Sequence, residues 1–405
     1  MGGVPHCTAH PLRRAYWPAY QLDHRVAAAG KCEVCPLYLP HLANPHKDIP
    51  NKNPKIATLA AYLERRMRKS LFKIREYGKY GFMDATGEVV IEPQYYAVED
   101  FYNGFSRVQL NDRLVPLDEM GRLLMRRFFN YVGLFEEHMA KVRLVQHWGF
   151  IDERGRVAIP MQFNDVSDFS EGAAAVKFNG HYGYIDQWGN YVIEPRFAWA
   201  GEFNEGLAPA TSGKHSGYIN SNGEFVIEPR FDECQPFQDT VAIVIQDNKW
   251  GLVDKEGNVL QKPQFDVSEG NTNGEFFDGM AVVMQNDRYG FISKDGSLAV
   301  PPQYDFAGDF GEGLALVEVA GKFGYINKTG EMVIVPRFED AGVFSDGLAQ
   351  VKKQGEWGFM DTTGRVVIAP RFQAVLPYKN GLAWGIEDGK WEYIDRWGDV
   401  VWREE

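Results

Sequence analysis

The chain has 405 residues, of which 44% are hydrophobic and 14% aromatic, and its net charge at neutral pH is -12. This composition is typical of a folded protein with a large core, and it excludes a disordered or collagen-like chain. No run reaches the roughly 18 apolar residues of a membrane helix, and residues 1–20 carry prolines and histidines where a secretory signal is apolar. A cytoplasmic location is therefore expected.

The charge is distributed unevenly along the chain. Residues 1–76 contain 13 Lys or Arg and 5 Asp or Glu, a net charge of +8, so the remaining residues carry -20. An acidic surface repels nucleic-acid phosphates, whereas a basic segment can contact them or can dock on the acidic part of its own chain. Any nucleic-acid contact is therefore expected in the basic N-terminal segment.

Two short pairs of potential metal ligands lie near the start of the sequence, namely Cys7, His10, Cys32 and Cys35. Each pair has two intervening residues, a spacing that lets one tight turn hold a tetrahedral Zn²⁺. Four protein ligands leave no open position, so the site would be structural. We predict a zinc module in residues 1–53, similar to a small treble clef or zinc ribbon. His6 and His24 are alternative ligands to His10, and the lone Cys234 is expected in the core.

Residues 54–76 are predicted to form a basic linker helix. Asn53 suits the N-cap and Pro54 the first helical position. Apolar residues follow at helical spacing, namely Ile56, Ala60, Leu63, Met67, Leu71 and Ile74, and Lys or Arg residues cover the other face. Such a helix can bind nucleic acid or an anionic surface, but no aromatic side chains are interleaved with the charges. The pattern favours a linker that packs on the first repeat.

A 34-residue spacing runs through residues 77–405. It is marked by glycines that follow Tyr, Trp, Ser or Phe, namely Gly81, Gly149, Gly183, Gly217, Gly251, Gly290, Gly324 and Gly358. The interval stretches once, to 39 residues between Gly251 and Gly290, because five residues are inserted within Asp266 to Glu275. Ten units of about 34 residues are predicted, with the second degenerate and the tenth truncated.

Every unit contains a four-residue turn signature, with Asp, Asn or Ser first and Gly fourth. The ten first positions are Asp84, Asp118, Asp152, Asp186, Asn220, Asp254, Ser293, Asn327, Asp361 and Asp395. The short polar side chain accepts a bond from the backbone two residues on, and the glycine takes a left-handed conformation. Each unit is therefore expected to contain a strand, a tight turn and a second strand.

After the turn come a β-branched pair and a proline, as in the sequence from Val192 to Pro195. The proline is expected to end the strand or to mark a sheet edge. Two aromatic positions then recur in register, and we expect them to form a continuous stacked core. The first is Tyr95, Phe129, Phe163, Phe197, Phe231, Phe265, Tyr304, Phe338 and Phe372, and the second is Phe101, Phe135, Phe169, Phe203, Phe237, Phe276, Phe310, Phe344 and Tyr378.

A period of 34 residues is also that of tetratricopeptide helix pairs. Glycine or proline falls so often in each unit that no helix of roughly 10 residues fits, whereas short strands do. The repeat region is therefore predicted to be an all-β array. Because ten blades are too many for an ordinary propeller, an elongated twisted β-solenoid or superhelix of short antiparallel strands is favoured, and a propeller-like closure is the alternative.

The phrase Trp148-Gly149-Phe150-Ile151-Asp152 and its copies resemble WG repeats, also called KWG repeats, of bacterial proteins. The resemblance covers roughly residues 77–402. It departs in the second unit, which has Leu114-Val115 in place of the Trp-Gly pair, and in the tenth, which has Trp391-Glu392. The resemblance implies a β-rich interaction array without shared catalytic residues.

Three polar positions also recur at the repeat period. Long side chains follow the proline at Gln94, Gln162, Arg196, Arg230, Gln264, Gln303, Arg337 and Arg371; short polar or acidic residues precede a later glycine at Asn103, Glu137, Glu171, Glu205, Asp239, Asp278, Glu312, Asp346 and Asn380. The first could form a donor face for a partner and the second could attract a basic one. We interpret them as solvated strand positions and ordinary turn chemistry. His147, His181 and His215 share a third position, where a metal or pH-responsive site is conceivable, but Lys or Arg occupies it in most other units.

No nucleophile elbow, phosphate-binding loop or zinc-protease motif is found, so no catalytic residue is assigned. The sequence predicts a non-enzymatic protein-interaction scaffold with a structural zinc site, with protein partners and no membrane contact. Two other functions stay open. One is an effector or nucleic-acid-contacting protein that uses the basic N-terminal segment. The other is an enzyme with its site on an irregular repeat, for which the insertion Asp266 to Glu275 is the place to look.

Overall fold

The structure is a computed structural model that describes residues 70–110, 113–125, 129–267 and 275–405. All of these residues belong to one unit of the chain, Thr58–Glu405. Every regular element in the described ranges is a β-strand, which confirms the all-β prediction for the repeat array. None of these residues forms a helix that could cross a membrane.

The strands form ten antiparallel sheets, and each sheet is built from strands that follow one another in the chain. The first five sheets are β1 (Phe72–Glu76), β2 (Lys79–Met83) and β3 (Val89–Tyr95); β4 (Phe105–Leu110) and β5 (Arg113–Asp118); β6 (Tyr131–Glu136), β7 (Met139–Leu144), β8 (His147–Asp152) and β9 (Val157–Phe163); β10 (Asp165–Val166), β11 (Ala174–Phe178), β12 (His181–Ile185) and β13 (Tyr191–Phe197); and β14 (Trp199–Ala200), β15 (Ala208–Ser212), β16 (His215–Ile219) and β17 (Phe225–Phe231).

The sixth to tenth sheets follow the same plan. They are β18 (Glu233–Cys234), β19 (Val241–Gln246), β20 (Lys249–Asp254) and β21 (Val259–Asp266); β22 (Met280–Gln285), β23 (Arg288–Ser293) and β24 (Leu298–Tyr304); β25 (Phe306–Gly311), β26 (Leu314–Val319), β27 (Lys322–Asn327) and β28 (Met332–Phe338); β29 (Asp340–Ala341), β30 (Leu348–Lys353), β31 (Glu356–Asp361) and β32 (Val366–Phe372); and β33 (Ala374–Val375), β34 (Ala383–Glu387), β35 (Lys390–Ile394) and β36 (Val400–Arg403).

The ten predicted turns are confirmed. In each of them the glycine amide donates to the carbonyl of the residue three positions earlier, over 2.8–3.1 Å. All ten glycines have left-handed φ angles, between 71° and 88°. In eight turns the first side chain also accepts the backbone N–H two residues on, as Asp186 does from Trp188 over 3.0 Å. The turn residues therefore set the hairpins of all ten sheets.

Each sequence repeat is shared between two neighbouring sheets. The unit that begins at Tyr182 contributes β12 and β13 to the fourth sheet, and its second half contributes β14 and β15 to the fifth. The boundary between sheets lies just after the first core aromatic, Phe197. Each repeat is thus a covalent connection across a sheet junction.

The predicted helix over 54–76 is wrong at its C-terminal end. Phe72–Glu76 form β1, which pairs with β2 from Phe72 opposite Met83 to Glu76 opposite Lys79. Phe72 and Ile74 alternate with more exposed residues, and this period of two fits a strand with one buried face. The strand also pairs with the hydrogen-bonding edge of β2, and a sheet edge left unpaired here would be costly. Residues 54–69 lie outside the described residues.

The prolines lie at the edges of the sheets, but they do not end the strands. In the fourth sheet Tyr182 pairs with Phe197 and Tyr184 pairs with Ile193, so β13 contains a bulge around Pro195. Because β13 is the last strand of its sheet, the N–H that Pro195 lacks costs no hydrogen bond between strands. The edge prediction is confirmed, and the prediction that the strand stops at the proline is wrong.

The bulge explains the glycine of the Trp-Gly pair. A Cβ atom on Gly183 would lie 2.4 Å from the carbonyl oxygen of Ile193, and the same clash, at 2.2–2.5 Å, recurs at all eight marker glycines. Only glycine lets the two backbones approach so closely. In the second unit Val115 stands at this position, and its sheet has only two strands within the described residues. In the tenth unit Glu392 pairs directly with Arg403, without a bulge at that point.

The core lies between consecutive sheets, as the two aromatic positions predict. All nine members of the first set are buried, and so are the members of the second set apart from the half-buried Phe101. The aromatic that follows the marker glycine packs on the second aromatic of the next sheet, as Tyr184 does on Phe203 with 4.7 Å between ring centroids. Six further pairs repeat this contact at 4.7–5.0 Å. These contacts join sheet to sheet along the array.

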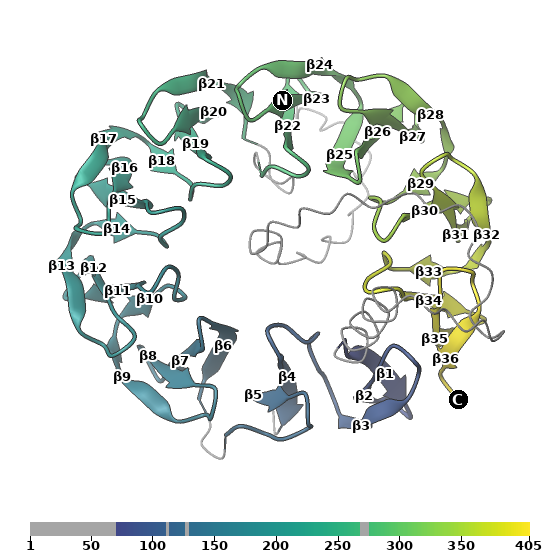
Figure 1. The fold of residues 1–405 in the computed structure, drawn as a ribbon, viewed down its shortest axis with the longest axis horizontal. Helices are drawn as coiled ribbons and strands as arrows, with labels where there is room; N and C mark the ends of the chain where they lie inside the picture. The colour runs from purple at the N-terminus through teal and green to yellow at the C-terminus, as the bar shows by residue number, and fades with distance from the viewer. Residues whose placement is uncertain (1–69, 111–112, 126–128, 268–274) are drawn as a thin grey trace, which may run out of the picture. The chain divides into compact units, whose positions relative to one another are not determined.

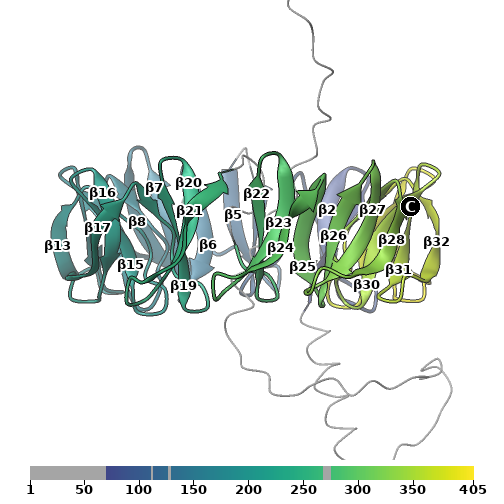
Figure 2. The ribbon, with the colours of Figure 1, turned by 90° about the horizontal axis from the view of Figure 1, so that it is seen from above.

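Within this unit the sheets follow one another around a ring, with the last strand of each sheet on the outside (Figure 1). They lie side by side at one level when seen from above (Figure 2). We call β3, β9, β13, β17, β21, β24, β28, β32 and β36 the outer strands. The first sheet is next to the tenth in Figure 1.

The first and tenth sheets make direct contact at a seam. The guanidinium of Arg75 donates to both carboxylate oxygens of Glu404, over 2.8 and 3.0 Å. The hydroxyl of Tyr393 donates to the carbonyl of Lys73 over 2.9 Å, and its ring packs on Phe72. One buried cluster mixes residues of both sheets, namely Phe72, Ile74, Met83, Ala85, Leu382, Tyr393 and Trp402.

These contacts do not fit the favoured prediction of an elongated solenoid, whose two ends would lie far apart. The described residues instead agree with the propeller-like alternative. The physical reason is that the same rotation is repeated from each sheet to the next, and over ten sheets it brings the last one back to the first. Local sequence spacing does not reveal the size of that rotation.

Candidate protein interface

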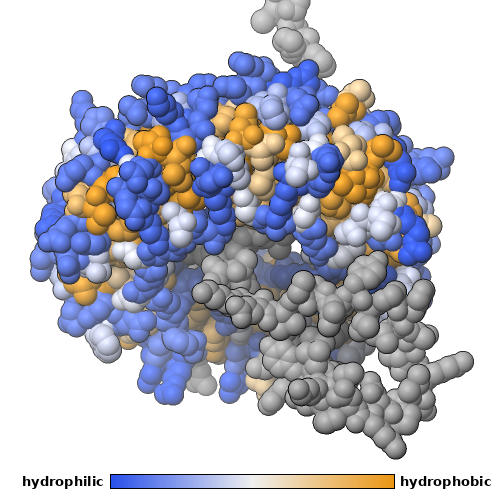
Figure 3. Space-filling model, turned by 45° about the horizontal axis from the view of Figure 1, so that its top comes forward, coloured by the Kyte–Doolittle hydropathy of each residue, from blue (hydrophilic) through white to orange (hydrophobic). Residues whose placement is uncertain are grey.

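The outer strands expose aliphatic side chains at a constant position. In β3, β9, β13, β17, β28 and β32 the third residue, such as Ile193, is buried against the core, whereas the second residue is exposed. Val90, Val192, Val226, Val333 and Val367 occupy this second position and are 39–51% exposed. In Figure 3, apolar side chains gather in separate patches on the visible wall, divided by hydrophilic ones. The outer wall therefore carries exposed aliphatic side chains that recur with the repeat.

The largest departure from this pattern lies on two neighbouring outer strands. Two residues after the exposed valine, most outer strands carry a charged residue or proline, namely Glu92, Pro160, Glu194, Glu228, Lys262 and Pro301. In β28 this residue is Val335, which is 60% exposed, and in β32 it is the exposed Ala369. We call Met332, Val333, Val335, Val366 and Val367 the β28–β32 patch. Clusters of exposed apolar residues mark interaction sites in many proteins.

Addition of a partner strand to this edge is disfavoured. Pro336 removes one N–H from the outer edge of β28, and the strand is bulged opposite Gly324. Prolines and bulges are the usual protection of exposed sheet edges. A partner would therefore contact the side chains of the patch and leave the backbone edge alone.

The arginines that follow the proline of an outer strand are bonded to a neighbouring sheet, so they are neither merely solvated nor a free donor face for a partner. Each donates from Nη2 to the turn glycine carbonyl of the next sheet, as Arg196 does to Gly223, Arg230 to Gly257 and Arg337 to Gly364, over 2.6–2.7 Å. Arg371 makes the same bond to Gly398 over 3.1 Å. Each guanidinium also lies 4.6–5.1 Å from the ring centroid of the phenylalanine that follows it. These arginines therefore tie neighbouring sheets together.

The acidic residues that precede the second turn glycine of each unit, such as Glu171 before Gly172, also connect sheets. In six sheets the carboxylate accepts a backbone N–H of the corresponding turn in the next sheet, as Glu171 does from Gly206 over 2.9 Å. The turn interpretation is confirmed, with the addition that the capped turn belongs to the neighbouring sheet. These carboxylates are engaged in structure, which leaves them poorly placed to attract a basic partner.

The three histidines lie on the surface and the lone cysteine in the core. His147, His181 and His215 are exposed at the first position of their strands. Within the described ranges, no group of three His, Cys, Asp or Glu residues could hold a metal ion. Cys234 is buried, as predicted, and this burial raises the pKa of its thiol to about 12.

The predicted zinc ligands Cys7, His10, Cys32 and Cys35 lie outside the described residues, as do His6 and His24. The same holds for residues 268–274, which make up most of the insertion. The predicted zinc site therefore stays a prediction. Sequence reasoning also missed the β28–β32 patch. An alignment of the ten units against one another would have found it, because Val335 stands where most other units have a charged residue or proline.

The fold and the outer wall define a β-rich repeat protein, and the comparison of sequences gives its family. The family described as WG containing repeat matches residues 80–113, 148–181, 182–214, 217–250, 250–289, 289–323, 323–357 and 357–391. These matches cover more than half of the chain, so the protein belongs to this family. They leave out residues 114–147, where the degenerate second unit lies.

One solved structure of low sequence identity shares the fold, and others are similar over parts of the chain. One described as "Crystal structure of the eukaryotic initiation factor" is 11% identical, covers 83% of this chain and 95% of its own, and has a TM-score of 0.50. Kluyveromyces lactis Hsv2 is 10% identical, with coverages of 61% and 89%, and PorZ of Porphyromonas gingivalis is 9% identical, with coverages of 83% and 52%. Their TM-scores of 0.35 and 0.28 are too low to support an argument. No curated protein sequence matches the chain.

Proposed function

We propose that this protein is a non-enzymatic protein-interaction scaffold, and that the β28–β32 patch binds a partner protein. The observation that carries the proposal is that Val335 and Ala369, on two neighbouring outer strands, stand where the other units have a charged residue or proline. Burial of such aliphatic groups is the main driving force of protein association. The recurring arginines and carboxylates are less suitable as partner-binding groups, because their side chains already bond to neighbouring sheets.

Replacing Val335 with glutamate is expected to weaken the capture of this partner at least about tenfold. The substitution restores the residue of the fourth and fifth sheets, so the fold should tolerate it. A carboxylate buried in an apolar contact without a counter-charge costs at least about 1.4 kcal/mol, which is a tenfold loss of affinity. The measurement is quantitative affinity capture with the full chain as bait, followed by titration calorimetry with the protein that is captured.

Val226→Glu is the matched control, because it places the same charge on β17, outside the patch. It should capture the same partner as the unmodified protein. Equal capture by the Val335→Glu protein, with its thermal unfolding unchanged, would remove the patch from the proposal. Loss of capture by both variants would point to a diffuse surface effect and would equally contradict a specific site.

We also propose that Cys7, His10, Cys32 and Cys35 hold a structural Zn²⁺, on the strength of their spacing. Protein purified without chelator is expected to contain about one zinc ion per chain. Cys32→Ala should lose the metal, whereas Cys234→Ala should keep it because Cys234 is buried in the repeat array. Elemental analysis by mass spectrometry measures both. A native protein with only trace zinc would contradict the assignment.

A further inference from the structure

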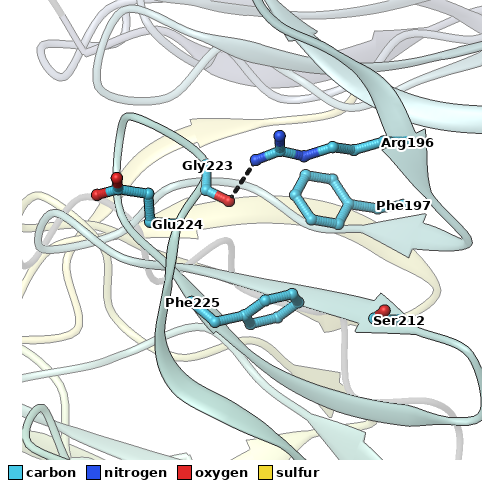
Figure 4. Close-up of a pocket in the computed structure, with 6 residues that line it drawn as sticks. All are labelled: Arg196, Phe197, Ser212, Gly223, Glu224 and Phe225. Carbon is cyan, nitrogen blue, oxygen red and sulfur yellow. Dashed lines mark hydrogen bonds between the residues drawn. The ribbon is translucent and has the colours of Figure 1, made fainter.

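One junction between neighbouring sheets shows which side chains meet beside the outer strands. Between the fourth and fifth sheets a hollow of 330 Å³ is lined by the end of β13, the end of β15 and the start of β17 with its turn (Figure 4). The lining residues are Arg196, Phe197, Ser212, Gly223, Glu224 and Phe225. The same positions recur with the repeat, so the residues that stand there can be compared from junction to junction.

The junction beside the β28–β32 patch has basic residues at three of these positions. They are Arg337, Lys353 and Arg365, the counterparts of Arg196, Ser212 and Glu224. At the other junctions that the chain crosses, no more than one of the three positions holds Lys or Arg. The departure in charge therefore falls at the same place as the departure in apolar character.

The basic side chains flank the apolar ones on both outer strands. Arg337 lies two residues after Val335, and its Nη2 donates to the carbonyl of Gly364 over 2.6 Å. Arg365 follows this glycine directly and precedes Val366 of the patch, and its side chain is 76% exposed. The bond from Arg337 to Gly364 thus brings the two arginines to one junction, next to the valines.

Much of this positive charge has no internal counter-charge. Arg365 donates from Nε to Asp361 of its own turn over 3.2 Å. Among the residues that the structure describes, neither Arg337 nor Lys353 forms an ion pair. Glu356 is opposite Lys353 in the hairpin register, but its counterpart His215 does not line the hollow of the fifth sheet. Two of the three cations can therefore pair with groups of a partner.

The next junction along the chain shows how a carboxylate is bound at this place. Between the ninth and tenth sheets, Arg371 is the counterpart of Arg337, and Glu387 is the counterpart of Lys353. Nε of Arg371 donates to the Glu387 carboxylate over 3.0 Å, while Nη2 keeps its bond to the turn glycine. The glycine bond uses one of the five N–H donors of a guanidinium, so it leaves room for a carboxylate. Beside the patch, lysine replaces this internal carboxylate.

We propose that the β28–β32 patch binds a protein segment that is acidic as well as apolar. Aliphatic side chains of the segment cover the patch, and its Asp or Glu carboxylates pair with Arg337 and Lys353. This inference rests on the proposed function and adds the chemistry of the partner. Complementary charges fix the register of a partner and exclude basic ones. A nucleic acid is disfavoured, because the surface between the cations is aliphatic.

The test is a selection of random displayed peptides on the full chain, from which peptides that also bind the Val335→Glu protein are removed. The remaining peptides should be richer in Asp, Glu and aliphatic residues than the library. A synthetic copy of the most enriched peptide is then titrated by fluorescence anisotropy. Lys353→Glu should weaken its binding at least about tenfold, because it supplies the internal carboxylate of the tenth sheet. Arg337→Gln should do the same, and glutamine stands at this position in four other units.

Arg230→Gln is the matched control. Arg230 makes the same bond to a turn glycine at a junction outside the patch, so the peptide should bind this variant as it binds the unmodified protein. Thermal unfolding checks that every variant is folded.

The outcomes separate this inference from the proposed function. If no peptide depends on Val335, both fail. If such peptides have no excess of Asp and Glu, or bind the Lys353→Glu protein equally well, the patch stands but the acidic partner is overturned. Binding of a single-stranded DNA that Lys353→Glu abolishes, without selection of acidic peptides, would assign the cations to nucleic acid and would also overturn the inference.

Discussion

Replacing Gly183 with alanine is expected to destabilise the protein by about 2–3 kcal/mol or more. The new Cβ would lie 2.4 Å from the carbonyl oxygen of Ile193 and 2.6 Å from the nitrogen of Pro195. Both are backbone atoms of the bulged outer strand, so no flexible side chain can move aside. The strand would have to shift away from β12 and lose cross-strand contacts. The change in the midpoint of urea or thermal unfolding measures the effect.

Gly308→Ala is the control for this substitution. Gly308 has no left-handed φ, and the nearest atom to its Cβ would be Leu316 Cβ at 3.4 Å, an ordinary contact. Its unfolding midpoint should stay close to that of the unmodified protein. If Gly183→Ala were as stable as Gly308→Ala, the close approach of the bulge would not be the reason for the Trp-Gly pair.

Trp402→Ala is expected to cost about 3–5 kcal/mol and to weaken the seam between the first and tenth sheets. Trp402 is buried in the cluster that contains Phe72, Ile74 and Met83 of the first sheet. Its removal leaves a cavity at the one junction that no chain connection crosses. The other nine junctions are each bridged by a sequence repeat, so this junction should separate first.

Two measurements distinguish this outcome from a general loss of stability. Trp397→Ala removes a tryptophan of the same sheet that is 59% exposed, and it should change stability by no more than about 0.5 kcal/mol. Small-angle scattering should show a larger radius of gyration for the Trp402→Ala protein below its unfolding temperature. An unchanged radius together with an unchanged melting curve would show that the seam does not hold the ends.

The local structure could be predicted from the sequence because it depends on short-range chemistry. The turn from Asp186 to Gly189 needs only its own residues to form, and Phe197 and Phe203 recur at the repeat period, so their burial follows from the pattern. The seam could not be predicted in this way. Arg75 and Glu404 are 329 residues apart, and nothing near either of them indicates that they meet.

The candidate interface was predictable in part. Val335 can be recognised by comparing the units with each other, since most of its counterparts are charged residues or prolines. The role of Arg196 could not be read in this way, because its partner is a backbone carbonyl in another sheet, 27 residues on. Spacing gives the position of a side chain within a unit, whereas its partner depends on how two units pack.

Because each repeat is shared between two sheets, the first and the tenth sheet each contain strands that elsewhere belong to one repeat. The tenth unit contributes β35 and β36 and then stops, which made it look truncated. In the other units the second half of a repeat supplies the strand that pairs with the next glycine-marked strand, as β11 pairs with β12. In the first sheet β1 holds this position beside β2, while β35 and β36 form the first half of a repeat in the tenth sheet. At the seam the two halves of a repeat pattern therefore meet through side chains, and the salt bridge from Arg75 to Glu404 is one of the contacts that join them.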